Sequence, residues 1–111
     1  MWVKFETAFQ RPDDEVVTLS DIQAKRAEIL KLAERHGAHH VRVFGSVVRG
    51  TSGPSSDVDI LVRLEPGRSL IDHIALMQDL AEMLGVNVDI VDEDAMHPLI
   101  RDKVLTEGLP L

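Results

Sequence analysis

The segment VFGSVVRGTSGPSSDVDILVRL, residues 43–64, decides how this sequence folds. Within an apolar strand pattern it places two aspartates, Asp57 and Asp59, one residue apart. A buried strand excludes unpaired charge, because an ionised carboxylate loses its hydration there. The two carboxylates therefore lie on an open face of a sheet, or they meet a cation.

The alternation of side chains along residues 57–63 places the apolar residues and the aspartates on opposite faces of the predicted strand. Val58, Ile60 and Val62 share one face of the predicted strand, and both aspartates lie on the other. We expect helices to cover the apolar face. The acidic face then remains accessible to a ligand.

The rest of the chain alternates between helical and strand periods, which is typical of an α/β (α+β) domain. The predicted elements are a helix opened by Ser20 and Gln23 in capping-box spacing and ended by Gly37, a strand over 41–45, a short helix over 46–49, a strand over 57–63, a helix over 69–84 capped by Ser69, a strand over 86–91, and a helix from Pro98 to near Gly108. A right-handed crossover through residues 69–84 makes the strands at 57–63 and 86–91 parallel neighbours.

This crossover places Asp89 beside Asp57 and Asp59. Three carboxylates on one face suit Mg²⁺, which takes oxygen ligands from a few carboxylates and from substrate phosphates. Two such ions about 3.5–4 Å apart activate an attacking oxygen and stabilise a leaving pyrophosphate. The pattern alone is also compatible with a solvated acidic face.

A second candidate feature precedes the acidic strand. Gly45 and Ser46 leave the strand at 41–45 and begin the short helix that ends at Arg49. A small residue, a hydroxyl, backbone amides and a guanidinium together favour a phosphate group. Taken alone, the same residues also fit an ordinary turn followed by an exposed arginine.

Composition limits the function classes. The chain has 111 residues, a net charge of −7 and no cysteine. The charge argues against general nucleic-acid or membrane binding, and we expect neither disulfides nor thiolate-bound zinc. No segment approaches the roughly 20 apolar residues of a membrane span, so we expect a cytoplasmic protein.

Taken together, GSVVRG, SDVDILV and NVDIV resemble the DNA polymerase beta-like nucleotidyltransferase superfamily, and in particular its minimal nucleotidyltransferase (MNT) branch. The resemblance covers residues 20–108 and implies a small mixed β-sheet with helices packed on one face. It implies that Asp57, Asp59 and Asp89 are catalytic and bind two Mg²⁺ ions. It also implies that Gly45, Ser46 and Arg49 bind the nucleotide, with ATP as substrate. Val47 departs from the pattern, since many relatives carry a basic residue there.

The branch includes antitoxin partners of HEPN toxins. The resemblance therefore implies an antitoxin that transfers AMP from ATP to a hydroxyl, a tyrosine in particular, of a HEPN ribonuclease toxin. Two alternatives remain: an antitoxin that neutralises its partner by binding alone, and nucleotidyl transfer to a small molecule. In this interpretation residues 20–111 form the catalytic domain, and residues 1–19 form an extension that serves as an edge strand or a partner contact.

Several polar residues are expected to lie outside the site. We expect His73 to be exposed on its helix and His97 to cap the last helix. The acidic run at 92–94 is expected to form a solvated turn before that helix.

Overall fold

The structure is a computed structural model that describes residues 2–5, 17–50 and 57–111. Its elements are β1 (Trp2–Phe5), α1 (Leu19–Ala24), α2 (Arg26–Arg35), β2 (Ala38–Phe44), α3 (Ser46–Arg49), β3 (Val58–Leu64), α4 (Leu70–Leu84), β4 (Val88–Asp92), the 3-10 helix η1 (Glu93–Ala95), α5 (Pro98–Glu107) and β5 (Leu109–Pro110). Residues 51–56, between α3 and β3, lie outside the described residues.

The strands form one five-stranded sheet in the order β1-β4-β3-β2-β5. β3 and β4 are parallel and are joined through α4, which confirms the predicted crossover. The other neighbouring pairs are antiparallel. The sheet is therefore mixed, as predicted, and β1 lies at its edge beside β4.

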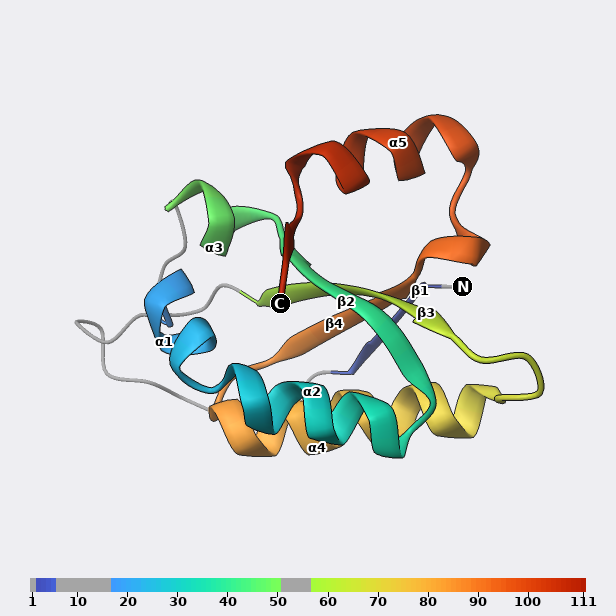
Figure 1. Ribbon diagram of the computed structural model, residues 1–111, viewed down its shortest axis with the longest axis horizontal. Coiled ribbons are helices and arrows are strands. Elements are labelled where there is room, and N and C mark those ends of the chain that lie inside the picture. Colours follow the sequence, from blue (N-terminus) through green and yellow to red (C-terminus); the bar gives the residue numbers. More distant parts are fainter. Residues whose placement is uncertain (1, 6–16, 51–56) are drawn as a thin grey trace.

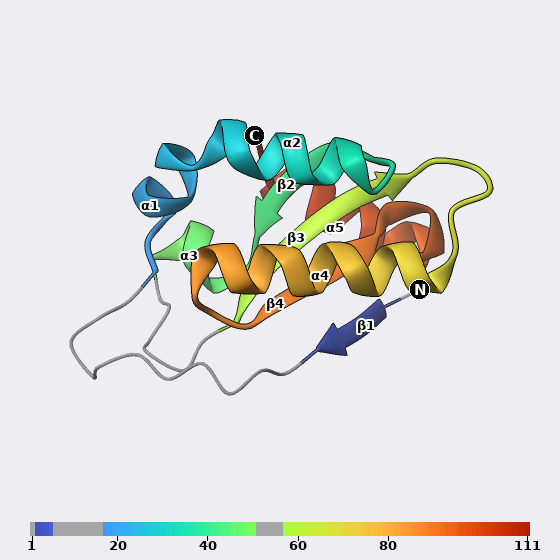
Figure 2. The same cartoon turned by 90° about the horizontal axis from the view of Figure 1, so that it is seen from below.

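Helices lie on both sides of this sheet (Figure 1). α2 and α4 lie on one face, and Figure 2 shows them side by side in front of the strands. α5 lies over the opposite side of the sheet, and none of its residues is buried. The helices that pack against the core, α2 and α4, share one face, as expected. Leu61 and Val91 are register partners that are buried on the second face, outside the main core cluster.

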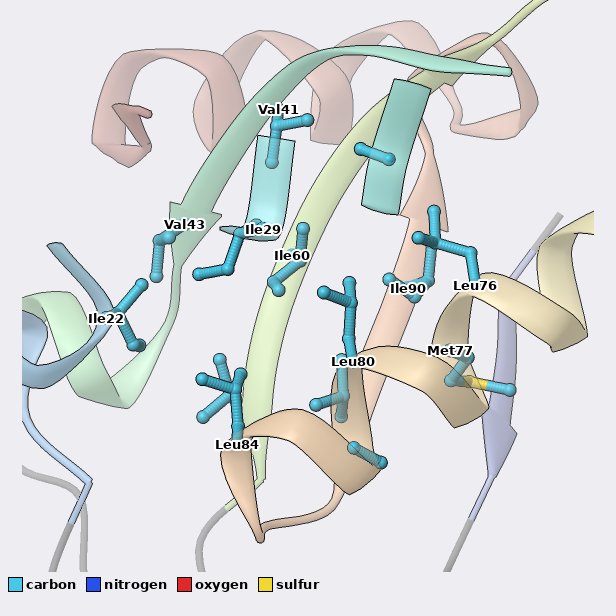
Figure 3. Packing of buried hydrophobic residues seen from close by; sticks show 14 of the residues in the cluster. Ile22, Ile29, Val41, Val43, Ile60, Leu76, Met77, Leu80, Leu84 and Ile90 are labelled. Carbon is cyan, nitrogen blue, oxygen red and sulfur yellow. The ribbon is translucent and has the colours of Figure 1, made fainter. Parts of the chain in front are cut away.

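The main core fills the space between the sheet and the two helices α2 and α4 (Figure 3). β3 contributes the residues that the alternation predicted, and all three are at most 2% exposed: Val58, Ile60 and Val62. The other strands and helices contribute, among others, Ile22, Ile29, Val43, Leu76, Met77, Leu80 and Ile90. This packing holds β3 and β4 against α4, and it fixes the position of the acidic face behind them.

Helix termini follow the predicted chemistry, with one correction. Ser69 caps α4 in a capping box with Asp72, and Gly85 ends the helix in the left-handed conformation. His97 accepts the Leu99 N–H at the start of α5, as predicted. The prediction of the first helix was wrong in two details. Thr18 with Asp21 forms its capping box, and the helix breaks at Lys25 into α1 and α2.

Two further corrections concern burial. His73 is 1% exposed, and its Nε2 lies 2.8 Å from the Ile90 carbonyl oxygen, so it is a core residue and not a surface one. Glu93 is 6% exposed and pairs with Arg63 at 2.8 Å, so the acidic run after β4 is only partly solvated. In both cases a polar partner from another part of the fold offsets the loss of hydration of the buried side chain.

None of the helices in the described residues has the length and apolar character needed to cross a membrane.

Candidate active site

The centre of the candidate site is a pair of carboxylates on neighbouring strands. Asp59 of β3 lies beside Asp89 of β4 in the parallel register. On its other side Asp59 lies opposite Phe44, the last residue of β2. Residues in register on adjacent strands share a face of the sheet, so the two carboxylates meet as the sequence predicted.

The electrostatics of this pair show that it tolerates two negative charges poorly. Burial raises the pKa of Asp59 from 3.8 to about 7, and the charge and hydrogen bond of Asp89 and the charge of Asp57 act in the same direction. Arg49 opposes them by lowering the pKa of Asp59. A hydrogen bond between two carboxyl groups requires one proton between them. A divalent cation offers a stronger way to neutralise the same charges.

The backbone of Gly45 lies close to the carboxylate of Asp59. Its φ is +80° and its ψ is −150°, a conformation that essentially only glycine adopts. A Cβ at this position would lie 2.2 Å from the Asp59 Oδ2 atom. Glycine is therefore required here both for the turn and for the space that the carboxylate occupies.

The turn that follows carries the predicted phosphate-binding groups. Ser46 begins α3 directly after Gly45, and Arg49 ends that helix on the surface. The amide of Arg49 donates to the Gly45 carbonyl at 3.2 Å, which holds the turn closed. The Ser46 hydroxyl and the Arg49 guanidinium thus belong to the same short segment as the glycine against Asp59.

Asp57 lies one step outside the pair. It immediately precedes β3, is half-buried, and influences Asp59 through its charge. Within the described residues, no three His, Cys, Asp or Glu side chains are gathered closely enough to hold a metal ion. The structure thus forms the Asp59–Asp89 pair with Asp57 adjacent, and the part of Asp57 as a metal ligand stays a prediction.

The donor chemistry of these residues fits a hard cation. Carboxylate oxygens are the ligands that Mg²⁺ prefers, and it commonly completes its shell with water and substrate phosphates. Asp59 and Asp89 are the residues best placed to hold such an ion. The two side chains lie close together, and the pKa of Asp59 is raised, an effect that a bound cation would oppose.

A pocket next to the turn includes a residue to which the sequence assigned no role. Gly45, Val48, Arg49 and Glu107 line a mostly apolar pocket of about 240 Å³. Glu107 is the last residue of α5, more than 50 positions from the turn. Its location depends on the pairing of β5 with β2, a contact that no local sequence pattern predicts.

His73 is the second residue that the sequence did not place near the site. Its imidazole reaches from α4 to the carbonyl of Ile90, the residue that follows Asp89. The contact fixes the backbone of β4 beside the carboxylate pair. A histidine within an apolar helix stripe was the available signal, but the sequence does not reveal which backbone atom it meets.

Comparisons with known proteins agree with this geometry. The family model of the nucleotidyltransferase domain matches residues 14–110. The chain is 40% identical to the protein adenylyltransferase MntA of Thermococcus cleftensis over 93 residues, which are 83% of this chain and 94% of that protein.

Solved structures give the same result. A structure described as that of a minimal nucleotidyltransferase is 48% identical, has a TM-score of 0.78, and is matched over 86% of this chain and 97% of its own. A chain from a toxin-antitoxin crystal structure with AMP-PNP is 30% identical, with a TM-score of 0.66 over 76% of this chain and 69% of its own. A chain from the complex of the tri-AMPylated Shewanella oneidensis HEPN toxin with its MNT antitoxin is 27% identical, with a TM-score of 0.62 over 79% of this chain and 69% of its own.

Proposed function

The chain belongs to the nucleotidyltransferase domain family, in its minimal nucleotidyltransferase branch, and we propose that it transfers AMP from ATP to a tyrosine hydroxyl of a HEPN-family toxin and thereby acts as an antitoxin. That it is a nucleotidyltransferase follows from the family. The acceptor, the nucleotide and the metal are parts of the proposal. The observation that carries it is the Asp59–Asp89 pair held against the Gly45 turn.

In the proposed reaction the acceptor oxygen attacks the α-phosphorus of ATP. A new O–P bond forms, the bond between the α-phosphorus and the bridging oxygen breaks, and pyrophosphate leaves with that oxygen. The hydroxyl proton passes to a carboxylate. Asp89 is the candidate for this step, because it is buried and lies on the face where the acceptor must arrive.

The other residues bind and orient the nucleotide. The Ser46 hydroxyl donates a hydrogen bond to a phosphate oxygen, and the Arg49 guanidinium offers a charge-assisted contact to the same group. Asp57, Asp59 and Asp89 would hold two Mg²⁺ ions. Such ions would supply positive charge that stabilises the attacking and leaving oxygens.

Two observations favour a protein acceptor. Similar chains carry the name protein adenylyltransferase. One similar chain was solved with an AMPylated HEPN toxin.

The test uses the purified chain, its HEPN-family partner, Mg²⁺ and ATP labelled at either the α- or the γ-phosphate. We expect label on the partner from the α-position alone, located on a tyrosine by peptide mass spectrometry. Asp89→Asn should abolish labelling. Asp94→Asn, a change at an exposed carboxylate beyond the far end of β4, serves as the matched control and should retain it.

Absence of α-label on the partner with the wild-type chain would contradict AMP transfer. The same experiment separates the binding alternative, because the ribonuclease activity of the partner can be measured in parallel. If the Asp89→Asn variant silences the partner as well as the wild type does, occlusion alone suffices for neutralisation.

A further inference from the structure

Gly45, Val48, Arg49 and Glu107 line a pocket beside the phosphate turn, and the mechanism above assigns no role to Val48 or Glu107. We propose that it receives the nucleoside end of the donor nucleotide, with the Glu107 carboxylate accepting hydrogen bonds from it. Glu107 thereby becomes a specificity-determining residue. The inference rests on the proposed nucleotidyl transfer and names the part of the chain that selects the nucleotide.

The position of the pocket is the first argument. Two of its lining residues, Gly45 and Arg49, also belong to the phosphate turn, and Gly45 lies against Asp59 on the catalytic face. A group in this pocket would therefore lie beside the phosphates that the turn is proposed to bind. For this reason we assign the pocket to the nucleotide.

The size of the pocket is the second argument. Pockets that enclose a whole drug-sized ligand measure about 300–1,000 Å³, and this one measures about 240 Å³. It accommodates one part of a nucleotide and not all of it. Its mostly apolar lining, to which Val48 contributes, suits the flat face of a base or a ribose ring more than a phosphate.

Charge is the third argument. A carboxylate accepts hydrogen bonds but donates none, and it repels phosphate oxygens. Glu107 therefore excludes a phosphate from its end of the pocket and favours the N–H groups of a base or the hydroxyls of a ribose. Arg49 supplies the opposite charge on the side of the turn. The two side chains thus divide the nucleotide into a phosphate end and a nucleoside end.

The fold holds Glu107 firmly in this place. Directly after it, Gly108 is buried, and Leu109 pairs with Val43 of β2. A Cβ at Gly108 would lie 3.0 Å from the Val104 carbonyl oxygen, so the chain turns tightly there. This anchoring brings the end of α5 to the turn, while Glu107 itself remains exposed and can be replaced without disturbing the core.

The test measures binding without the partner protein. Isothermal titration in Mg²⁺ compares AMP-PNP with inorganic tripolyphosphate, for the wild type, Glu107→Ala and the control Asp102→Ala, which alters an exposed carboxylate on the same helix. We expect Glu107→Ala to weaken AMP-PNP binding about 10- to 100-fold, as for a lost hydrogen bond to a charged group, and to leave tripolyphosphate binding unchanged. Asp102→Ala should change neither.

Equal binding of AMP-PNP by Glu107→Ala and the wild type would overturn the inference. Equal loss for both ligands would also overturn it, since it would assign Glu107 to the phosphate end. If AMP-PNP binding is unchanged and the labelling assay with the partner protein shows a raised Michaelis constant for that acceptor, the pocket belongs to the acceptor instead. Because binding is measured without transfer, a chain that binds AMP-PNP through Glu107 but labels no partner would refute the proposed function alone.

Discussion

Replacing Gly45 by alanine tests the geometry of the site most directly. The new Cβ would lie 2.2 Å from Asp59 Oδ2, whereas real Cβ contacts essentially never fall below 3.0 Å. The carboxylate or the turn must therefore move by at least 3.0 − 2.2 = 0.8 Å. The backbone conformation, φ +80° and ψ −150°, adds a strain of about 1–3 kcal/mol for any residue with a side chain.

A matched control separates these two effects. Gly67, in the turn after β3, has φ +87°, and a Cβ there would meet nothing within 4 Å. Gly67→Ala thus introduces a positive-φ alanine without a clash and far from the carboxylates. We expect both variants to lose stability in urea denaturation, with Gly45→Ala losing more by about 1 kcal/mol or above because of the contact with Asp59.

The decisive difference lies in function. A displacement near 1 Å at a catalytic centre costs on the order of 100-fold in rate. We expect Gly45→Ala to transfer AMP at least that much more slowly and to bind Mn²⁺, used as a spectroscopic substitute for Mg²⁺, more weakly. Gly67→Ala should retain both activities. If the two variants transfer AMP at equal rates, Asp59 does not need the position that Gly45 leaves open, and the description of the site is wrong.

Four further expectations follow from the structure. The pKa of Asp59 is about 7 in the folded state and 3.8 ordinarily. Between these two pH values the metal-free folded protein therefore binds one more proton than the unfolded chain. Its free energy of unfolding should fall as the pH rises from 4 to 7, and Asp59→Asn should remove that part of the pH dependence. For the same reason the apparent affinity for Mn²⁺ should rise with pH up to about 7 and then level off, and a pH-independent affinity would contradict the protonated pair. His73→Leu removes the donor to the Ile90 carbonyl and should cost about 1–3 kcal/mol in urea denaturation; no loss would mean that the contact contributes nothing. Leu80→Ala empties a fully buried position and should cost about 2–5 kcal/mol, whereas Leu99→Ala, at a side chain 77% exposed, should cost under about 0.5 kcal/mol; equal losses would refute the assignment of the core.

The part of the fold around the site could be predicted from the sequence because short-range rules act there together. Period-2 alternation in β3 set Asp59 on the face opposite Ile60. The Ser69 cap and Gly85 bounded a helix long enough for one crossover, and a crossover of this kind joins parallel strands, so β4 is parallel to β3. Once the strands are parallel neighbours, the meeting of Asp59 with Asp89 needs no further information.

What could not be predicted depends on contacts between segments far apart in the sequence. The burial of His73 depends on one carbonyl oxygen 17 residues away, and that of Glu93 depends on Arg63 across the sheet end. The start of the first helix was predicted wrongly for a local reason. Two capping boxes compete within three residues there, and Thr18 with Asp21 is the one that forms.

The position of α5 explains how so short a chain combines a covered sheet with an accessible site. On the face opposite the core, β3 carries Asp59 near its start and Leu61 two residues later, and Leu61 is fully buried while Asp59 is half-buried. The same face must therefore be closed at one end and open at the other. α5 lies over this face, its C-terminal end lies near the turn, and β5 then runs back along β2 (Figure 1). The end of this helix thus places Glu107 at the edge of the open half, where we propose that the nucleotide binds. Lengthening the segment after Glu107 by even one residue should therefore impair nucleotide binding more than stability, because β5 would pair with β2 as before while the carboxylate lost its place at the turn.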